Sequence, residues 1–219
     1  MDDKTQAKSE SQEVCPPWLC FTFDNFLRRL VQNPNRILGK YIKPDWTALD
    51  VGPGMGYFTI PLAKLVGNKG KVIAADLQQP MLDGIKRKAF KAGVQDRIEL
   101  HLTKSDSIGI SEPVDFCLTF WMVHEVPDRG HFIREIASQL KPGGLWLIAE
   151  PKVHVSTKDF NRTLEIAKNA GLSVVDRPNI FISNAVVLKK WLVSVLVDSP
   201  FSPVVDLLII LCLQEDKYN

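Results

Sequence analysis

Cysteine is scarce in this sequence, and the few cysteines form no disulfide pattern. Cys15, Cys20, Cys117 and Cys212 are spread over 219 residues. Their spacing excludes a small secreted domain held together by disulfides. The N-terminus is polar and acidic and lacks the apolar core of a secretion signal. We therefore expect residues 1–13 to be a disordered tail and the protein to be cytoplasmic.

The chain also lacks an excess of charge of either sign. Lys and Arg number 27 against 25 Asp and Glu, which leaves a formal net charge of +2. Because the positive and negative charges nearly cancel, the net charge gives no electrostatic reason to bind a polyanion. We therefore expect no nucleic-acid partner.

Long apolar runs are missing except near the C-terminus, between Trp191 and Leu213. Two prolines and two aspartates interrupt this segment, which argues against insertion into a membrane as a spanning helix. We expect residues 191–219 to form an apolar C-terminal extension. It would pack on the domain or on a second copy of the chain, as in a homodimer.

From residue 43 onward, short β-rich runs alternate with amphipathic helical stretches, a pattern typical of βαβ units around a parallel sheet. The predicted strands are 47–51, 71–75, 97–102, 114–120 and 145–149. The runs LSVVDRP and NAVVLKK follow so closely on one another that they must pair antiparallel. The sequence predicts an α/β fold whose sheet is mostly parallel and ends in an antiparallel hairpin.

Capping residues mark the ends of three predicted helices. Pro80 suits the first turn of one helix, and Gly93 can end it in the left-handed conformation. Asp128 is placed to cap a second helix, which KPGG at 141–144 should stop. Ser156 resembles the first residue of a capping box for the third helix.

The stretch LDVGPGMGYF, Leu49 to Phe58, places three glycines directly after the first predicted strand. A dinucleotide fingerprint would need a further glycine at position 57, which is occupied by Tyr57. An aspartate just before the loop would also oppose a pyrophosphate. These features exclude a nicotinamide cofactor. The pattern is instead Asp-x-Gly-x-Gly-x-Gly over Asp50, Gly52, Gly54 and Gly56.

This loop and the motifs after it resemble the class I S-adenosylmethionine-dependent methyltransferases over residues 43–190. The resemblance implies a Rossmann-like three-layer sandwich with a seven-stranded sheet, and S-adenosyl-L-methionine as cofactor. In VIAADLQQPML the carboxylate of Asp76 would accept hydrogen bonds from both ribose hydroxyls. The residues that the resemblance assigns to cofactor binding are Asp50, Gly52, Gly54, Gly56, Asp76, Leu77, Asp106, Ser107 and Trp121.

The stretch FWMVHEVPD after the fourth strand is the expected place for catalysis, because strand ends face the ligand crevice in such sheets. His124 and Glu125 resemble the His-Asp pair of plant-type small-molecule O-methyltransferases. The resemblance implies that His124 is the general base for a hydroxyl acceptor. The alternative is that His124 lines the substrate pocket or caps a helix.

Residues 14–42 are expected to form an N-terminal helical lid before the methyltransferase domain. Trp18, Phe21 and Phe23 are candidates for the substrate pocket, although ordinary helix packing also explains them. Thiols at Cys15 and Cys20 could hold a soft metalloid such as arsenite, but packed thiols explain them better. We predict no metal site.

The function hypothesis is an enzyme that transfers the methyl group of S-adenosylmethionine to a small molecule by in-line displacement. The Asn-Pro-Pro-aromatic motif that holds a flipped base is absent, which disfavours nucleic-acid methylation. Three alternatives stay open: a metalloid methyltransferase, a lipid or quinone methyltransferase, and a protein that binds the cofactor without turnover.

Overall fold

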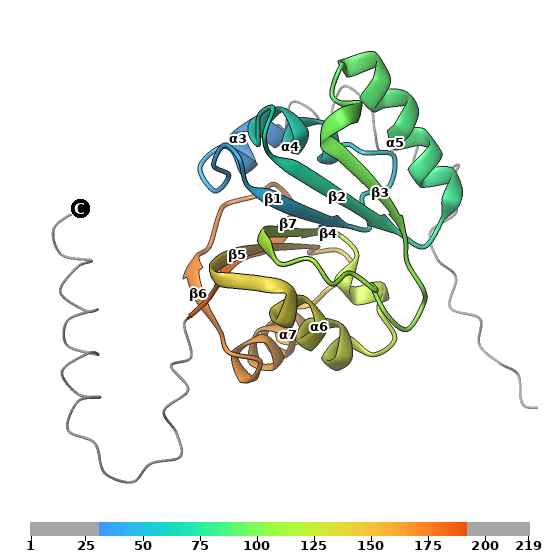
Figure 1. Ribbon diagram of the computed structural model, residues 1–219. Coiled ribbons are helices and arrows are strands. Elements are labelled where there is room, and N and C mark those ends of the chain that lie inside the picture. Colours follow the sequence, from blue (N-terminus) through green and yellow to red (C-terminus); the bar gives the residue numbers. More distant parts are fainter. Residues whose placement is uncertain (1–30, 192–219) are drawn as a thin grey trace, which may run out of the picture.

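The computed structural model describes residues 31–191 of the chain (Figure 1). The strands are β1 (Thr47–Val51), β2 (Lys71–Asp76), β3 (Ile98–Leu102), β4 (Val114–Phe120), β5 (Leu140–Pro151), β6 (Leu172–Asp176) and β7 (Ser183–Lys190). The α-helices are α3 (Pro34–Leu38), α4 (Thr59–Leu65), α5 (Gln79–Ala92), α6 (Arg129–Gln139) and α7 (Thr157–Asn169). The described region also contains two short 3₁₀ helices, η1 (Gln95–Arg97) and η2 (Val123–Glu125).

The seven strands form one sheet in the order β3-β2-β1-β4-β5-β7-β6. The pairs β1–β2, β1–β4, β2–β3 and β4–β5 are parallel. By contrast, β7 runs antiparallel to both β5 and β6. The predicted fold class, with a mostly parallel sheet that ends in an antiparallel hairpin, is confirmed.

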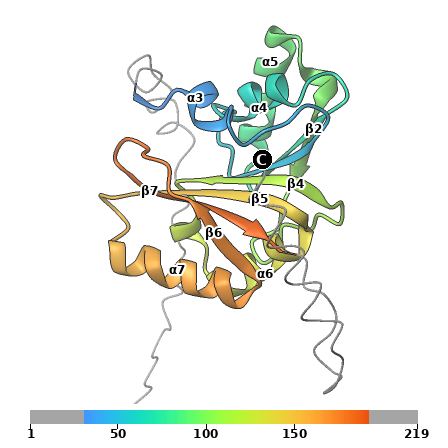
Figure 2. The same cartoon turned by 90° about the vertical axis from the view of Figure 1, so that its left-hand side faces the viewer.

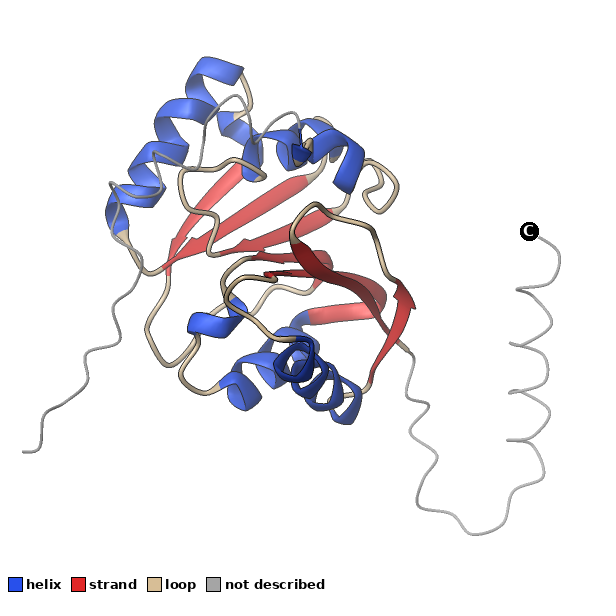
Figure 3. Cartoon of the chain, turned by 180° about the vertical axis from the view of Figure 1, so that it is seen from behind, coloured by secondary structure: helices blue, strands red, loops and turns tan. Residues whose placement is uncertain are grey.

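Helices cover both faces of the sheet, as the views in Figures 2 and 3 show. Helices α3, α4 and α5 lie on one face, and α6 and α7 lie on the other. Successive strand residues point to opposite faces, so Ala48 packs in the core beneath α3 and α4 while Leu49 packs in the core beneath α6 and α7. A parallel sheet buried on both sides requires such uninterrupted apolar strands.

The predicted helix ends agree with the structure. Gly93 has φ 65° directly after α5, and the Asp128 carboxylate accepts a hydrogen bond from the N–H of His131 at 2.8 Å. At the start of α7, the Ser156 hydroxyl accepts from the N–H of Asp159 at 3.1 Å. These caps satisfy backbone groups that helix ends leave free.

The structure corrects one detail of the predicted boundaries. The residues KPGG lie inside β5, which begins at Leu140 directly after α6, so the strand starts five residues before its predicted start at 145. The pairing register of β4 and β5 shifts between Val114 and Phe116, which accommodates this irregular start.

The proposed lid and the C-terminal extension fall largely outside the described residues. Of residues 14–42, the structure describes those from Val31 onward, including α3, whose cap Asn33 accepts from the N–H groups of Asn35 and Arg36. Of residues 191–219, it describes Trp191.

Candidate active site

A cavity of about 690 Å³ opens at the carboxyl ends of the parallel strands. Its walls come from the loops after β1, β2, β3, β4 and β5. The strand order reverses between β1 and β4, and ligands of open α/β sheets bind at such a switch point. The volume lies in the range of small-molecule sites, roughly 300–1,000 Å³.

The glycine loop forms one wall of this cavity. Gly52, Gly54 and Gly56 have φ of 65°, 53° and 79°, a region that side chains rarely adopt. A Cβ on Gly52 would lie 3.0 Å from Cγ of Met122, whereas a Cβ on Gly54 would meet nothing within 4 Å. Gly52 and Gly54 line the cavity, and Gly54 leaves open space there for a ligand to approach the backbone.

Gly56 has a different structural role from the other two glycines. It is not among the residues that line the cavity, and a Cβ there would lie 3.0 Å from Cγ1 of Ile85 on α5. Gly56 therefore allows the loop to pack closely against α5.

Asp50 lines the cavity and is almost completely buried. It is 2% exposed, and its carboxylate accepts a hydrogen bond from the Thr59 hydroxyl at 2.7 Å. Burial raises the pKa of Asp50 to about 7, and the hydrogen bond from Thr59 opposes that rise. A carboxylate in this position gains from a neighbouring cation, because it lacks a cationic side-chain partner within hydrogen-bonding range among the described residues.

Asp76 ends β2 and lines the same cavity, 8% exposed. Burial raises its pKa to about 6, although backbone N–H groups, including that of Gln78 at 2.9 Å, favour the charged form. Leu77, beside it, lines the cavity with a 46% exposed side chain. The carboxylate and the apolar side chain suit a ribose and an adenine ring, respectively.

The loop after β3 is attached to α6 by a carboxylate that sequence reasoning missed. Glu135 accepts hydrogen bonds from the Ser107 hydroxyl at 2.8 Å and from the N–H groups of Ile108 and Gly109 at 3.0 Å each. Burial raises the pKa of Glu135, but these three donors together lower it below its usual value. Asp106 and Ser107 both line the cavity, and the Ser107 hydroxyl is engaged by Glu135.

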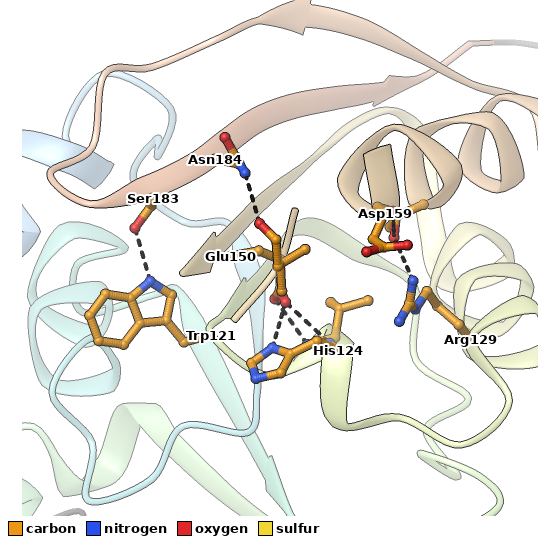
Figure 4. A network of polar contacts seen from close by, with 10 residues as sticks. Trp121, His124, Arg129, Glu150, Asp159, Ser183 and Asn184 are labelled. Atoms are coloured by element: carbon orange, nitrogen blue, oxygen red, sulfur yellow. Dashed lines mark hydrogen bonds and ion pairs between the residues drawn. The ribbon is translucent and has the colours of Figure 1, made fainter. Parts of the chain in front are cut away.

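Trp121 follows β4 with a backbone conformation that bulky residues rarely adopt, φ 62°. Its N–H donates to the carbonyl of Ala149 at 2.7 Å, and its indole Nε1 donates to the Ser183 hydroxyl at 2.9 Å. Figure 4 shows the indole beside Ser183. Trp121 therefore joins the end of β4 to the start of β7 at the cavity wall.

His124 is held against Glu150, the second functional candidate that sequence reasoning missed (Figure 4). Glu150 is 2% exposed, and its carboxylate lies 2.6 Å from Nδ1 of His124. The same carboxylate accepts from the N–H groups of Val123 and His124 at 3.0 and 3.2 Å. Because Glu150 accepts, Nδ1 carries the proton, which leaves Nε2 of the neutral ring as a proton acceptor.

The hydrogen bond from His124 to Glu150 is the largest of the influences that raise the pKa of His124. Figure 4 shows the second ring nitrogen directed away from Glu150, and His124 lines the cavity. His154 also lines the cavity, with its ring nearly parallel to that of His124 at a centroid separation of 6.1 Å. Glu125 lines the cavity as well, and burial raises its pKa.

Several predicted site residues are not placed by the structure. Trp18, Phe21 and Phe23 lie outside the described residues, as do Cys15, Cys20 and Cys212. Cys117 is buried within β4, and burial raises the pKa of its thiol well above the usual value. Within residues 31–191, no three His, Cys, Asp or Glu side chains are grouped so that they could hold a metal ion.

Among the helices between residues 31 and 191, none is both long and apolar enough to cross a membrane.

The residues present fit S-adenosylmethionine. The open approach at Gly54, the buried carboxylate of Asp50 and the carboxylate of Asp76 at the end of β2 all border one cavity. The two carboxylates suit the positive charge and the ribose hydroxyls of such a molecule. The cavity brings these three groups together.

Comparison with known proteins agrees with this geometry. Residues 48–144 match the family model described as a methyltransferase domain. A SAM-dependent methyltransferase from Aquifex aeolicus is 26% identical, with a TM-score of 0.68, and the match covers 80% of this chain and 97% of that one. The [4+2]-cyclase SpnF has the same fold at 19% identity and a TM-score of 0.57, covering 67% of this chain and 59% of that one.

Among curated proteins, the chain is similar to the ubiquinone/menaquinone biosynthesis C-methyltransferase UbiE of Escherichia coli. The two are 30% identical over 110 residues, which are 50% of this chain and 44% of that relative. The chain thus matches less than half the length of this relative. The family model over residues 48–144, the fold and the arrangement of the cavity together support a class I S-adenosylmethionine-dependent methyltransferase, with S-adenosyl-L-methionine as cofactor.

Proposed function

We propose that the protein transfers a methyl group to a small-molecule acceptor, with His124 as general base and Glu150 as its positioning residue. The observation that carries the proposal is the His124–Glu150 pair on the wall of the cavity that Asp76 and the glycine loop also line. When bound, S-adenosylmethionine supplies an electrophilic methyl group on a sulfonium and leaves as the thioether S-adenosylhomocysteine.

The cofactor-binding roles follow from the lining residues. Asp76 would accept the ribose hydroxyls, and Gly52 and Gly54 would admit the methionine portion beside Asp50. The loop with Asp106 and Ser107 would border the adenine, held in place by Glu135. Leu77 and Trp121 would contribute apolar walls, whereas Gly56 supports the loop from behind.

The chain's own contribution to methyl transfer is alignment and proton removal. Nε2 of His124 would take the proton of an acceptor hydroxyl as the acceptor oxygen forms its bond to the methyl carbon. Glu150 keeps the Nδ1 proton in place and favours the imidazolium that results. A positioned base of this kind contributes about 10²–10⁴-fold to the rate. Alignment of the two reactants contributes further.

A quinone precursor is the second candidate acceptor, and the similarity to UbiE favours it. The name of that relative states a C-methyltransferase of ubiquinone and menaquinone biosynthesis, so the acceptor atom would be a ring carbon. His124 could then remove the proton of an activating ring hydroxyl or of the methylated carbon. The cavity has the size for one such ring.

The first experiment measures binding of S-adenosylhomocysteine by isothermal titration calorimetry. Asp76→Ala should weaken binding about tenfold or more, because charge-assisted hydrogen bonds to ribose are lost. Asp83→Ala removes an exposed carboxylate of α5 and serves as the control. Absence of binding by the unmodified chain would refute the proposal.

The second experiment follows transfer of a labelled methyl group to a panel of phenols, quinols, amines and thiols, with arsenite as the metalloid arm. His124→Ala should lower kcat on a hydroxyl acceptor by about 10²–10⁴-fold while binding of S-adenosylhomocysteine stays within twofold. An unchanged kcat would rule out the base role. Cofactor binding without transfer to any acceptor would instead identify a binding protein.

A further inference from the structure

Three exposed apolar side chains lie on two chain segments that contribute to the lining of the cavity. Val153 is 76% exposed, Phe181 54% and Ile182 42%. Val153 follows β5, and the other two end the loop between β6 and β7. Val153 and Ile182 line the cavity itself. We call these three residues the apolar rim.

Backbone and side-chain hydrogen bonds hold the apolar rim in place. The N–H of Lys152 donates to the carbonyl of Ile182 at 2.9 Å, which ties the two rim segments together. The carbonyl of Phe181 accepts from the side chain of Gln32 at 3.2 Å. The indole of Trp121 donates to the hydroxyl of Ser183, the residue after the rim (Figure 4). The rim is therefore fixed from three sides before any ligand arrives.

The backbone at the rim adopts a conformation that costs energy for a β-branched residue. Ile182 has φ 53°, a region in which β-branched residues are rare and in which glycine or asparagine would fit without that cost. Within residues 31–191 three residues other than glycine have positive φ, and two of them, Trp121 and Ile182, line this cavity. Strain of this kind concentrates at ligand sites. The strained backbone thus lies in the wall of the cavity, where the Ile182 side chain is partly exposed.

We propose that the apolar rim is a subsite for an uncharged alkyl or aryl substituent of the methyl acceptor, whose nucleophilic group lies at His124. This inference rests on the proposed function and specifies the acceptor as an amphipathic molecule. The rim side chains have no polar atoms, so they give a charged substituent no partner. Three side chains are also far too few for a stable protein interface, which buries roughly 1,200 Å² or more.

The rim makes a quantitative prediction for binding of 4-alkylphenols, from methyl to hexyl, to the full chain saturated with S-adenosylhomocysteine. Calorimetry should show affinity rising about twofold to fourfold for each added methylene until the alkyl group passes the rim. Phenols with chains of equal length that end in a carboxylate should show no such gain.

Two variants test whether the gain arises at the rim. Ile182→Asn introduces a residue that tolerates the left-handed backbone conformation at this position. Val153→Ser shortens an exposed side chain. Both variants should therefore fold. Together they should reduce the gain per methylene to less than half. Phe90→Ser, which removes a 75% exposed phenylalanine from α5, should leave the gain unchanged. Circular dichroism verifies folding of each variant.

The outcomes separate the rim from the proposed function. An unchanged gain per methylene in the double variant, or no gain in the unmodified chain, would overturn the rim subsite. If the gain depends on the rim but no acceptor is methylated, the subsite stands and the proposed methyl transfer fails. If phenols are methylated with rates independent of chain length, the transfer stands and the subsite fails.

Discussion

Replacement of Asp50 by asparagine should stabilise the cofactor-free protein while it weakens cofactor binding. Burial raises the pKa of Asp50 from 3.8 to about 7. At pH 8 the side chain is ionised in both the folded and the unfolded states, so its charge opposes folding. The cost follows from 1.36 kcal/mol per pKa unit and amounts to about 4 kcal/mol.

The sign of the pH dependence follows from the raised pKa. The stabilising effect of a protonated Asp50 is fully present below pH 3.8 and is lost as pH rises through about 7. Asparagine carries no charge and so avoids the penalty of the ionised carboxylate, but its buried amide costs roughly 1–2 kcal/mol. The net gain at pH 8 should be about 2–3 kcal/mol, which raises the melting temperature by roughly 5–10 °C for a chain of this size. At pH 4 the gain should be absent, and Asp50→Asn should be slightly less stable than the unmodified chain, because the cost of the buried amide remains.

Thermal unfolding followed by circular dichroism at pH 4 and pH 8 measures this effect. Asp83→Asn, an exposed carboxylate of α5, is the control and should change the melting temperature little at either pH. Calorimetry should show that Asp50→Asn weakens binding of S-adenosylmethionine about 10–100-fold at pH 8, because a charge-assisted contact is lost. If the difference in melting temperature between Asp50→Asn and the unmodified chain is the same at both pH values, the reasoning from burial is wrong.

Three further predictions concern the other walls of the cavity. Glu150→Gln should move the acidic limb of the pH profile of kcat to lower pH, because Glu150 raises the pKa of His124. The maximal kcat should fall at least about tenfold. An acidic limb that stays at the same pH would contradict the pairing of His124 with Glu150. Glu135→Gln should weaken binding of S-adenosylhomocysteine by several fold, as measured by calorimetry, since the loop that it anchors borders the cavity. Gly52→Ala should reduce the affinity for S-adenosylhomocysteine more than Gly67→Ala does, because both glycines have positive φ but, of the two, Gly52 alone is crowded by a neighbouring side chain. Equal losses of affinity would show that backbone strain accounts for the whole effect.

The sheet and the glycine loop could be predicted from sequence because their signals are local. Short apolar runs that alternate with amphipathic helical stretches mark the strands. The pattern from Asp50 to Gly56 lies within seven consecutive residues. Asp76 was recognisable because it stands at the end of a predicted strand. Its partners are neighbouring backbone N–H groups, which need no knowledge of the rest of the fold.

Glu150 and Glu135 were not predicted because each acts on a residue far away in sequence. Glu150 contacts His124 across 26 residues, and Glu135 contacts Ser107 across 28. A signal for Glu150 was present, since it too ends a predicted parallel strand, as Asp76 does. For Ile182 the sequence contains no comparable signal, because its positive φ arises from contacts of the hairpin loop with Lys152 and other segments.

The buried thiol of Cys117 makes the protein a reporter of its own unfolding. Cys117 lies in β4, the central strand of the sheet, with β1 and β5 on either side. A thiol reagent can reach it only when these strands separate, and its raised pKa makes the thiol unreactive until then. The rate at which Cys117 becomes labelled therefore measures the opening of the sheet beneath the cofactor cavity. That rate should fall as S-adenosylhomocysteine is added, by the factor with which the ligand stabilises the folded state.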